Sequence, residues 1–135
     1  MLALHGKGGD GASFERYMQP LIDATSHDWD WEFPTGPHDD GSGAGGRAWW
    51  KLPPGVRTFE AAELEGIEES LAMVEQAWPF DGVMGFSQGA MLAAVVCGRG
   101  LKGQGWGTFY HVLLQKSYVK HQMMTPSTGY FGFRV

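Results

Sequence analysis

One pattern in the sequence points directly to nucleophilic chemistry. Residues 85–89 read Gly-Phe-Ser-Gln-Gly and match G-x-S-x-G. An apolar segment, residues 80–86, runs into this pattern, and an alanine-rich segment follows it. Strand, turn and helix in this order form a nucleophile elbow, which lifts the serine hydroxyl above the carboxyl edge of a sheet. Ser87 is therefore the predicted nucleophile, and Gly85 and Gly89 are expected where strand and helix approach too closely for side chains.

A glycine-rich segment, residues 5–11, follows the apolar run 2–4 near the start of the chain. Enzymes with a nucleophile elbow hold the oxyanion with two backbone N–H groups. One belongs to the residue after the nucleophile, here Gln88, and the other to a loop after an earlier strand. We predict the backbone N–H of Lys7 as the second donor. His5 is expected to bond the loop backbone rather than to act as a base.

The apolar periodicity around these segments predicts alternating strands and helices. The expected strands are 2–4, 29–33 and 80–86, and the expected helices are 12–25, 59–77 and 88–97, the first capped by Ser13. Such alternation implies an α/β fold, a parallel sheet with helices on its faces. Residues 35–57 form a long Gly- and Pro-rich loop, and loops of this length are typically functional lids or disordered.

Length and charge bound the class of protein. The chain has 135 residues and a net charge of −5, which fits one domain and argues against a general nucleic-acid binder. No apolar stretch approaches the roughly 20 residues that span a bilayer, and no signal peptide is visible. The single cysteine, Cys97, excludes an internal disulfide and is expected as a small buried hydrophobe. We expect a cytoplasmic protein.

Two further patterns predict no ligand. Residues 41–46 fit G-x-G-x-x-G, but no strand precedes them, so a dinucleotide site is not expected. Residues 38–40, His-Asp-Asp, form one short polar loop, which is usually solvated. The sequence therefore predicts neither a cofactor nor a metal ion.

Three segments together resemble the FSH family of serine hydrolases, a branch of the α/β-hydrolase fold. They are residues 4–6 with the glycine-rich loop, Arg-Ala-Trp-Trp at 47–50, and residues 85–90. The resemblance covers roughly residues 1–100. It implies an esterase- or thioesterase-like enzyme with a Ser-His-Asp triad and a small-molecule ester or thioester substrate. Trp49 and Trp50 are expected to pack the lid, with some contact to an acyl pocket.

The triad cannot be completed in the usual order of serine, acid and histidine. No Asp or Glu follows Ser87, and the last carboxylate side chain is Asp81, so no triad acid is identifiable. Two histidines follow, His111 and His121, and they are the candidates for a base that the sequence leaves unknown.

The charge divides the chain at about residue 100. Residues 1–100 carry a net charge of about −9, and residues 101–135 carry about +4. We expect residues 1–100 to be the N-terminal part of a serine hydrolase domain, with a sheet incomplete on its C-terminal side. Residues 101–135 are expected to be a divergent, partly disordered basic tail, with a strand at 109–114 and disorder at 125–135. A truncated gene model, a retained intron or an alternative splice form would produce such a chain.

Three hypotheses of function remain. The first is a serine hydrolase that cleaves carboxylic esters or thioesters through Ser87. The second is a catalytically inactive relative that lacks the triad acid and base. The third is an enzyme like the acyl-protein thioesterases and carboxylesterases, which share a similar elbow. The third hypothesis is less favoured than the first, because of Thr-Gly-Pro at 35–37 and the tryptophan pair.

Overall fold

A computed structural model describes residues 1–101 and 111–115 of the chain. The elements in chain order are β1 (Leu2–Leu4), α1 (Gly11–Thr25), β2 (His38–Asp39), β3 (Arg47–Ala48), the 3-10 helix η1 (Thr58–Glu60), α2 (Ile67–Gln76), β4 (Gly82–Phe86), α3 (Gln88–Leu101) and β5 (His111–Gln115).

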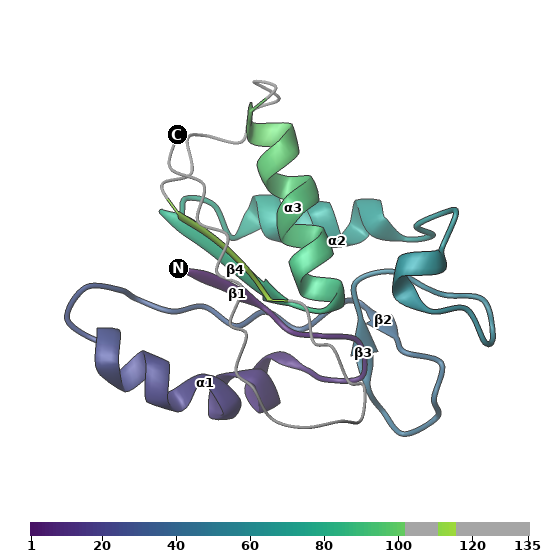
Figure 1. The fold of residues 1–135 in the computed structure, drawn as a ribbon, viewed down its shortest axis with the longest axis horizontal. Coiled ribbons are helices and arrows are strands. Elements are labelled where there is room, and N and C mark those ends of the chain that lie inside the picture. Colours follow the sequence, from purple (N-terminus) through teal and green to yellow (C-terminus); the bar gives the residue numbers. More distant parts are fainter. Residues whose placement is uncertain (102–110, 116–135) are drawn as a thin grey trace, which may run out of the picture.

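The central sheet is parallel and has the strand order β1-β4-β5. Helix α1 covers one face of this sheet, and α2 and α3 cover the other (Figure 1). The predicted α/β class is confirmed. Because the strands are parallel, β1 and β4 end at the same edge, and the segments that follow both strands meet there.

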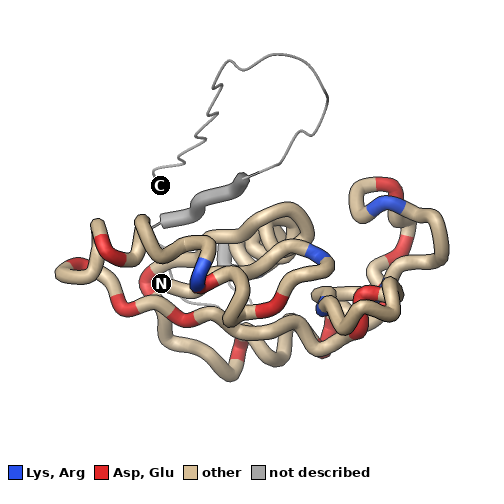
Figure 2. The backbone as a smooth tube through the Cα atoms, turned by 90° about the horizontal axis from the view of Figure 1, so that it is seen from below, with Lys and Arg blue, Asp and Glu red and all other residues tan. Residues whose placement is uncertain are grey.

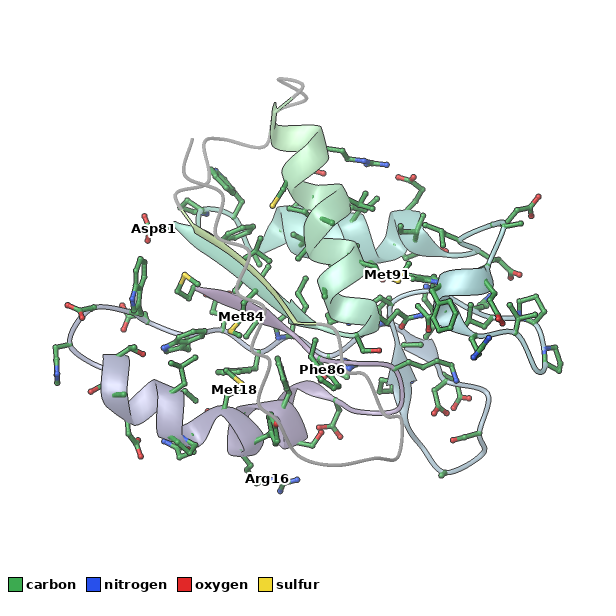
Figure 3. All side chains as sticks on the ribbon, viewed as in Figure 1. Arg16, Met18, Asp81, Met84, Phe86 and Met91 are labelled. Carbon is green, nitrogen blue, oxygen red and sulfur yellow. The ribbon has the colours of Figure 1, made fainter. Side chains whose placement is uncertain are left out.

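Two apolar clusters hold these layers together. The cluster on the α2 and α3 side of the sheet contains both tryptophans of residues 49–50, fully buried. The cluster on the α1 side joins Met18 of α1 to Met84 of β4, and Figure 3 shows both side chains in the layer between helix and sheet. Burial on both faces explains why β4 reads as a continuous apolar run rather than an alternating one.

The prediction of a strand at residues 29–33 is wrong. Only Glu32 pairs there, in a single parallel bridge to Leu2. The Ala3 N–H donates to the Glu32 carbonyl at 2.8 Å, and the Glu32 N–H donates to the Met1 carbonyl at 2.9 Å. The alternation still has a physical basis, because Trp31 and Phe33 pack against the α1-side cluster.

Two helix boundaries differ from the prediction. Residues 59–77 were expected as one helix, but α2 begins only at Ile67, after η1 and a turn. Gly66 has a φ of 84°, a left-handed conformation that interrupts a helix. Helix α3 runs on to Leu101, four residues beyond the predicted end at Cys97.

The N-terminus of α1 is capped by Asp10 rather than by the predicted Ser13. The Asp10 carboxylate accepts from the Ser13 backbone N–H at 2.7 Å, and the Ser13 hydroxyl accepts from the Asp10 N–H at 3.0 Å. This reciprocal pair is a capping box with Ser13 at its third helical position. The hydrogen bond to Ser13 holds the pKa of the Asp10 carboxyl below its ordinary value.

The long loop contains a small antiparallel hairpin. His38 pairs with Ala48 and Asp39 pairs with Arg47, and residues 41–45, three of them glycines, form the exposed tip. The Arg47 guanidinium donates through Nε to the Gly36 carbonyl at 3.0 Å, which ties the two arms of the loop together. The long loop is therefore ordered, with its hairpin fixed by backbone pairing and by the Arg47 side chain.

The tail predictions are tested only at β5. A strand was expected at 109–114, and β5 occupies His111–Gln115. The predicted disorder at 125–135 lies outside the described residues, as do His121 and most of the expected basic tail. Figure 2 shows acidic positions spread along the described backbone and few basic ones. In the part of the chain that the structure describes, the helices are too short or too polar for a membrane span.

Candidate active site

Ser87 lies in a sharp turn between the end of β4 and the start of α3. Its φ of 52° is the only positive φ of a non-glycine residue in the described part of the chain. An L-residue in this region is strained by about 1 kcal/mol or more, and such strain concentrates at functional sites. The side chain is half-buried at the carboxyl edge of the sheet.

The glycines on either side of Ser87 are required by close backbone contacts. A Cβ atom at Gly85 would stand 2.3 Å from the carbonyl carbon of Gly89, and one at Gly89 would stand 2.1 Å from the Leu4 oxygen. Real Cβ atoms do not approach backbone atoms this closely. The prediction that strand and helix leave no room for side chains here is confirmed.

The glycine-rich loop after β1 lies beside this turn. A Cβ atom at Gly6 would stand 3.3 Å from the Cβ of Ser87. The Gly9 N–H donates to the Gly6 carbonyl at 3.1 Å, and Gly8 has a φ of 90°, as a type II turn requires. Lys7 therefore occupies the first central position of a tight turn one residue beyond the contact with Ser87.

The hairpin holds this tight turn in place. The Gly8 N–H donates to the Arg47 carbonyl at 2.8 Å, and the Arg47 N–H donates to the Gly9 carbonyl at 3.0 Å. The third and fourth residues of the turn are thus bonded to Arg47 of β3, so the loop is held against the hairpin.

Two backbone donors are left near Ser87. Within the described residues, the N–H groups of Lys7 and Gln88 have no protein acceptor. Gln88 is the first residue of α3, and the first N–H groups of a helix lack intrahelical partners and carry its positive dipole end. The arrangement can hold a negative charge that develops beside the Ser87 hydroxyl.

His5 has a structural role, as predicted. Its side chain is buried, Nε2 accepts from the Gly36 N–H at 2.9 Å, and Nδ1 lies 2.8 Å from the Gly6 carbonyl. Since Nε2 accepts, Nδ1 carries the proton and donates it. Burial lowers the pKa of His5, so the imidazole is held neutral. With both nitrogens occupied, it cannot take a proton from Ser87.

The tryptophan pair lies in the core rather than at the surface. Trp49 and Trp50 are both 0% exposed. The side-chain amide of Gln88 bonds both residues: Oε1 accepts from the Trp49 N–H at 2.8 Å, and Nε2 donates to the Trp50 carbonyl at 3.1 Å. Sequence reasoning missed this role of the Gln88 side chain, because no local pattern reports a partner 39 residues away.

A hollow of about 270 Å³ opens beside the turn, on the α1 side of the sheet. Aromatic rings from α1 and β4 form its apolar walls, and the loop after β1 forms its rim. Figure 3 shows Phe86 between the end of β4 and α1. The lining residues are His5, Gly6, Lys7, Gly9, Ser13, Phe14, Tyr17 and Phe86. The tryptophan pair is not among them.

The structure separates His111 from Ser87. His111 pairs with Gly82, and Gln115 pairs with Phe86, so His111 starts β5 at the amino edge of the sheet. At about 3.3 Å per residue, the His111 backbone lies roughly 13 Å along the strand direction from the level of Phe86. His121 lies outside the described residues.

The other polar groups singled out in the sequence have local roles. His38 Nε2 lies 2.7 Å from the Gly66 carbonyl, and Asp39 and Asp40 accept hydrogen bonds within the hairpin tip. Across residues 1–101 and 111–115, no group of three potential ligands is suited to a metal ion. Cys97 is partly buried, and burial raises the pKa of its thiol to about 11.

Comparison with known proteins gives the family of the chain. The family described as serine hydrolase (FSH1) matches residues 1–125, which extends past the boundary expected near residue 100. The chain belongs to this serine hydrolase family.

Several curated relatives carry related names. The human esterase OVCA2 is 49% identical over 65 residues, which is 42% of this chain and 29% of that protein. The esterase GA18864 of Drosophila pseudoobscura pseudoobscura is 30% identical over 116 residues, 76% of this chain and 40% of that protein. An uncharacterized hydrolase of Schizosaccharomyces pombe is 28% identical over 115 residues, 70% of this chain and 27% of that protein. The matched parts span between 27% and 40% of the length of these relatives.

Proposed function

We propose that this chain cleaves carboxylic esters or thioesters through a nucleophilic Ser87. The observation that carries the proposal is the φ of 52° at Ser87. A serine held in this strained conformation, between the glycines of the turn, is the geometry of a nucleophile elbow. The family match and the esterase names of the relatives support the same chemistry.

In this mechanism the Ser87 oxygen attacks the carbonyl carbon of the substrate. The backbone N–H groups of Lys7 and Gln88 stabilise the oxyanion, because neither has another acceptor in the described part of the chain. Collapse of the tetrahedral intermediate releases the alcohol or thiol, which takes up the proton that the Ser87 hydroxyl lost on attack, and leaves an acyl group on Ser87. Water then hydrolyses this acyl-enzyme.

The hollow provides the place for an apolar substituent of the substrate. Its aromatic walls, Phe14 and Phe86, adjoin the turn through Gly6, which lies against Ser87. A volume of about 270 Å³ exceeds the roughly 150 Å³ that encloses a benzene molecule, so one ring or a short branched chain fits. The substrate proposed here is therefore a small apolar ester or thioester.

The second candidate function is a site with a nucleophile but without turnover. One observation favours it: the base must accept the Ser87 proton across about 2.6–3.2 Å, and His111 starts β5 at the opposite edge of the sheet. No carboxylate side chain follows Ser87 in the sequence to orient a histidine. Such a chain would bind esters and react slowly with them.

A fluorophosphonate probe tests the nucleophile. We expect the wild-type chain to be labelled and Ser87→Ala to remain unlabelled. Ser42→Ala, in the exposed tip of the hairpin, is the control and should be labelled like the wild type. Absence of labelling in a wild-type chain shown to be folded by circular dichroism overturns the proposal.

Turnover separates the two candidate functions. The release of nitrophenol from short p-nitrophenyl esters and of thiol from matched thioesters is measured for wild type, Ser87→Ala, His111→Gln and His121→Gln. Turnover that depends on Ser87 supports the hydrolase. Labelling without turnover supports the inactive relative. A strong preference for acylated peptides over small esters would favour an activity like that of the acyl-protein thioesterases.

A further inference from the structure

The side chain of Gln88 links the residue after the nucleophile to the long covering loop. It is fully buried, and its amide oxygen and nitrogen bond the Trp49 N–H and the Trp50 carbonyl, respectively. Because the amide oxygen and nitrogen of Gln88 bond consecutive residues, a shift of Gln88 would also shift the Trp49-Trp50 backbone.

The Trp49 side chain continues this connection toward the glycine-rich loop. Its indole N–H donates to the His5 carbonyl at 2.7 Å, and its ring lies 4.8 Å from the His5 ring, centroid to centroid. The same His5 carbonyl lies against α3, because a Cβ atom at Gly89 would stand 2.6 Å from its oxygen. One buried oxygen is thus held between the indole and the first turn of α3.

The imidazole of His5 continues this series of hydrogen bonds to two further segments, at Gly36 and at Gly6. It accepts from the Gly36 N–H and donates to the Gly6 carbonyl. Gly6 contacts Ser87, and Lys7 follows it. A chain of hydrogen bonds therefore runs from the Gln88 amide through Trp49 and His5 to Gly6, the residue that precedes Lys7; it is buried as far as His5 and partly buried at Gly6.

We propose that Gln88, through its side chain, and Trp49 are positioning residues that set the spacing between the Lys7 and Gln88 backbone N–H groups. This inference rests on the proposed function of those two N–H groups as oxyanion donors. The hydrogen bonds of the Gln88 amide and the Trp49 indole are buried, so water cannot replace a broken one, and the loop shifts relative to the turn.

Trp50 provides a matched control in the next position. Both indoles are 0% exposed, but the Trp50 Nε1 has no hydrogen-bond partner among the described residues. Trp49→Phe and Trp50→Phe each remove one indole N–H and a similar volume. Only Trp49→Phe removes a hydrogen bond to the His5 carbonyl.

Labelling kinetics provide the first test. Both variants are assayed with the fluorophosphonate under conditions where circular dichroism shows them folded, and kinact is separated from KI. Trp49→Phe is expected to lower kinact at least about tenfold with little change in KI, because misplaced donors act on the transition state. Trp50→Phe is expected to lower kinact by about twofold or less. Equal losses in both variants, or a change confined to KI, overturn the inference.

The second test does not depend on activity. In a ¹H–¹⁵N spectrum, Trp49→Phe should displace the Lys7 amide signal and Trp50→Phe should leave it in place. If the wild type is not labelled, the proposed function fails, and this comparison alone decides whether the two sites are coupled; an unmoved Lys7 signal overturns the coupling. Should Trp49→Phe not fold, Gln88→Met, which keeps the volume and the backbone N–H, replaces it in both measurements.

Discussion

The Cα of Gly89 lies against the carbonyl oxygen of Leu4, so that a Cβ atom at Gly89 would stand 2.1 Å from that oxygen. The first turn of α3 therefore packs directly on the end of β1. Because backbone atoms stand on both sides of the contact, no side-chain rotation can relieve it. This contact brings the start of α3, the end of β1 and the turn at Ser87 to one edge of the sheet.

Gly89→Ala is accordingly expected to destabilise the chain by about 3 kcal/mol, the range of an overpacked core. Gly98→Ala is the control in the same helix. A Cβ atom there meets nothing within 4 Å, and the change should stabilise by about 0.5 to 1 kcal/mol through helix propensity. Urea unfolding of both variants gives the two free energies. A Gly89→Ala chain as stable as Gly98→Ala would contradict the close approach.

The strained backbone at Ser87 is predicted to lower the stability of the folded chain at the residue that reacts. Glycine adopts a φ of 52° without the steric penalty of a Cβ atom, so Ser87→Gly should be more stable than Ser87→Ala by about 1 kcal/mol. Both variants should be inert to the fluorophosphonate. The two unfolding free energies are compared by urea denaturation, and equal values would show that the backbone at residue 87 relaxes.

The sequence predicts the turn at Ser87 well because its determinants are local. A strained serine, two glycines and the flanking apolar segments all lie within about ten residues. The same holds for β1 and β4, whose apolar runs are short and continuous. The helix expected at 59–77 fails for a different reason: the apolar period continues across Gly66, whose left-handed φ of 84° places its backbone against the His38 ring.

Contacts between distant segments could not be predicted. The period of two at residues 29–33 indicates which side chains face the core. Whether a strand forms depends on the hydrogen bonds that the neighbouring backbone can make, and β1 forms only one bridge to this segment. The Gln88 side chain and the Trp49 indole likewise act across 39 and 44 residues. Their residue types gave no signal beyond the apolar character of the tryptophans.

The buried His5 predicts a pH dependence of stability. Burial lowers the pKa of the folded His5 below the value of about 6.5 expected in the unfolded chain. Between these two values the unfolded state binds more protons, so stability falls as the pH decreases below about 6.5. The hydrogen bond to the Gly6 carbonyl and the Asp10 carboxylate oppose this lowering of the pKa, and Arg47 adds to it, but burial dominates.

His5→Gln isolates this effect from the other titrating groups. Glutamine can keep an acceptor for the Gly36 N–H without gaining a charge, so its stability should fall less steeply between pH 7 and pH 5. The difference in slope is limited to about 1.4 kcal/mol per pH unit for one group. Urea midpoints at a series of pH values measure it. Parallel curves for the two chains would show that His5 does not titrate with folding.

The last prediction concerns the outer wall of the hollow. Tyr17 lines it and is 70% exposed, so Tyr17→Ala should change stability by no more than about 0.5 kcal/mol. If the hollow holds an apolar substituent, the variant should react about threefold more slowly with an aryl fluorophosphonate, while its rate with a methyl analogue stays unchanged. Leu21→Ala, one turn further along α1 and outside the hollow, is the control and should alter neither rate. The ratio of the two labelling rates is the measurement, since it cancels any effect on Ser87 itself. An unchanged ratio in Tyr17→Ala would place the substituent elsewhere on the carboxyl edge of the sheet.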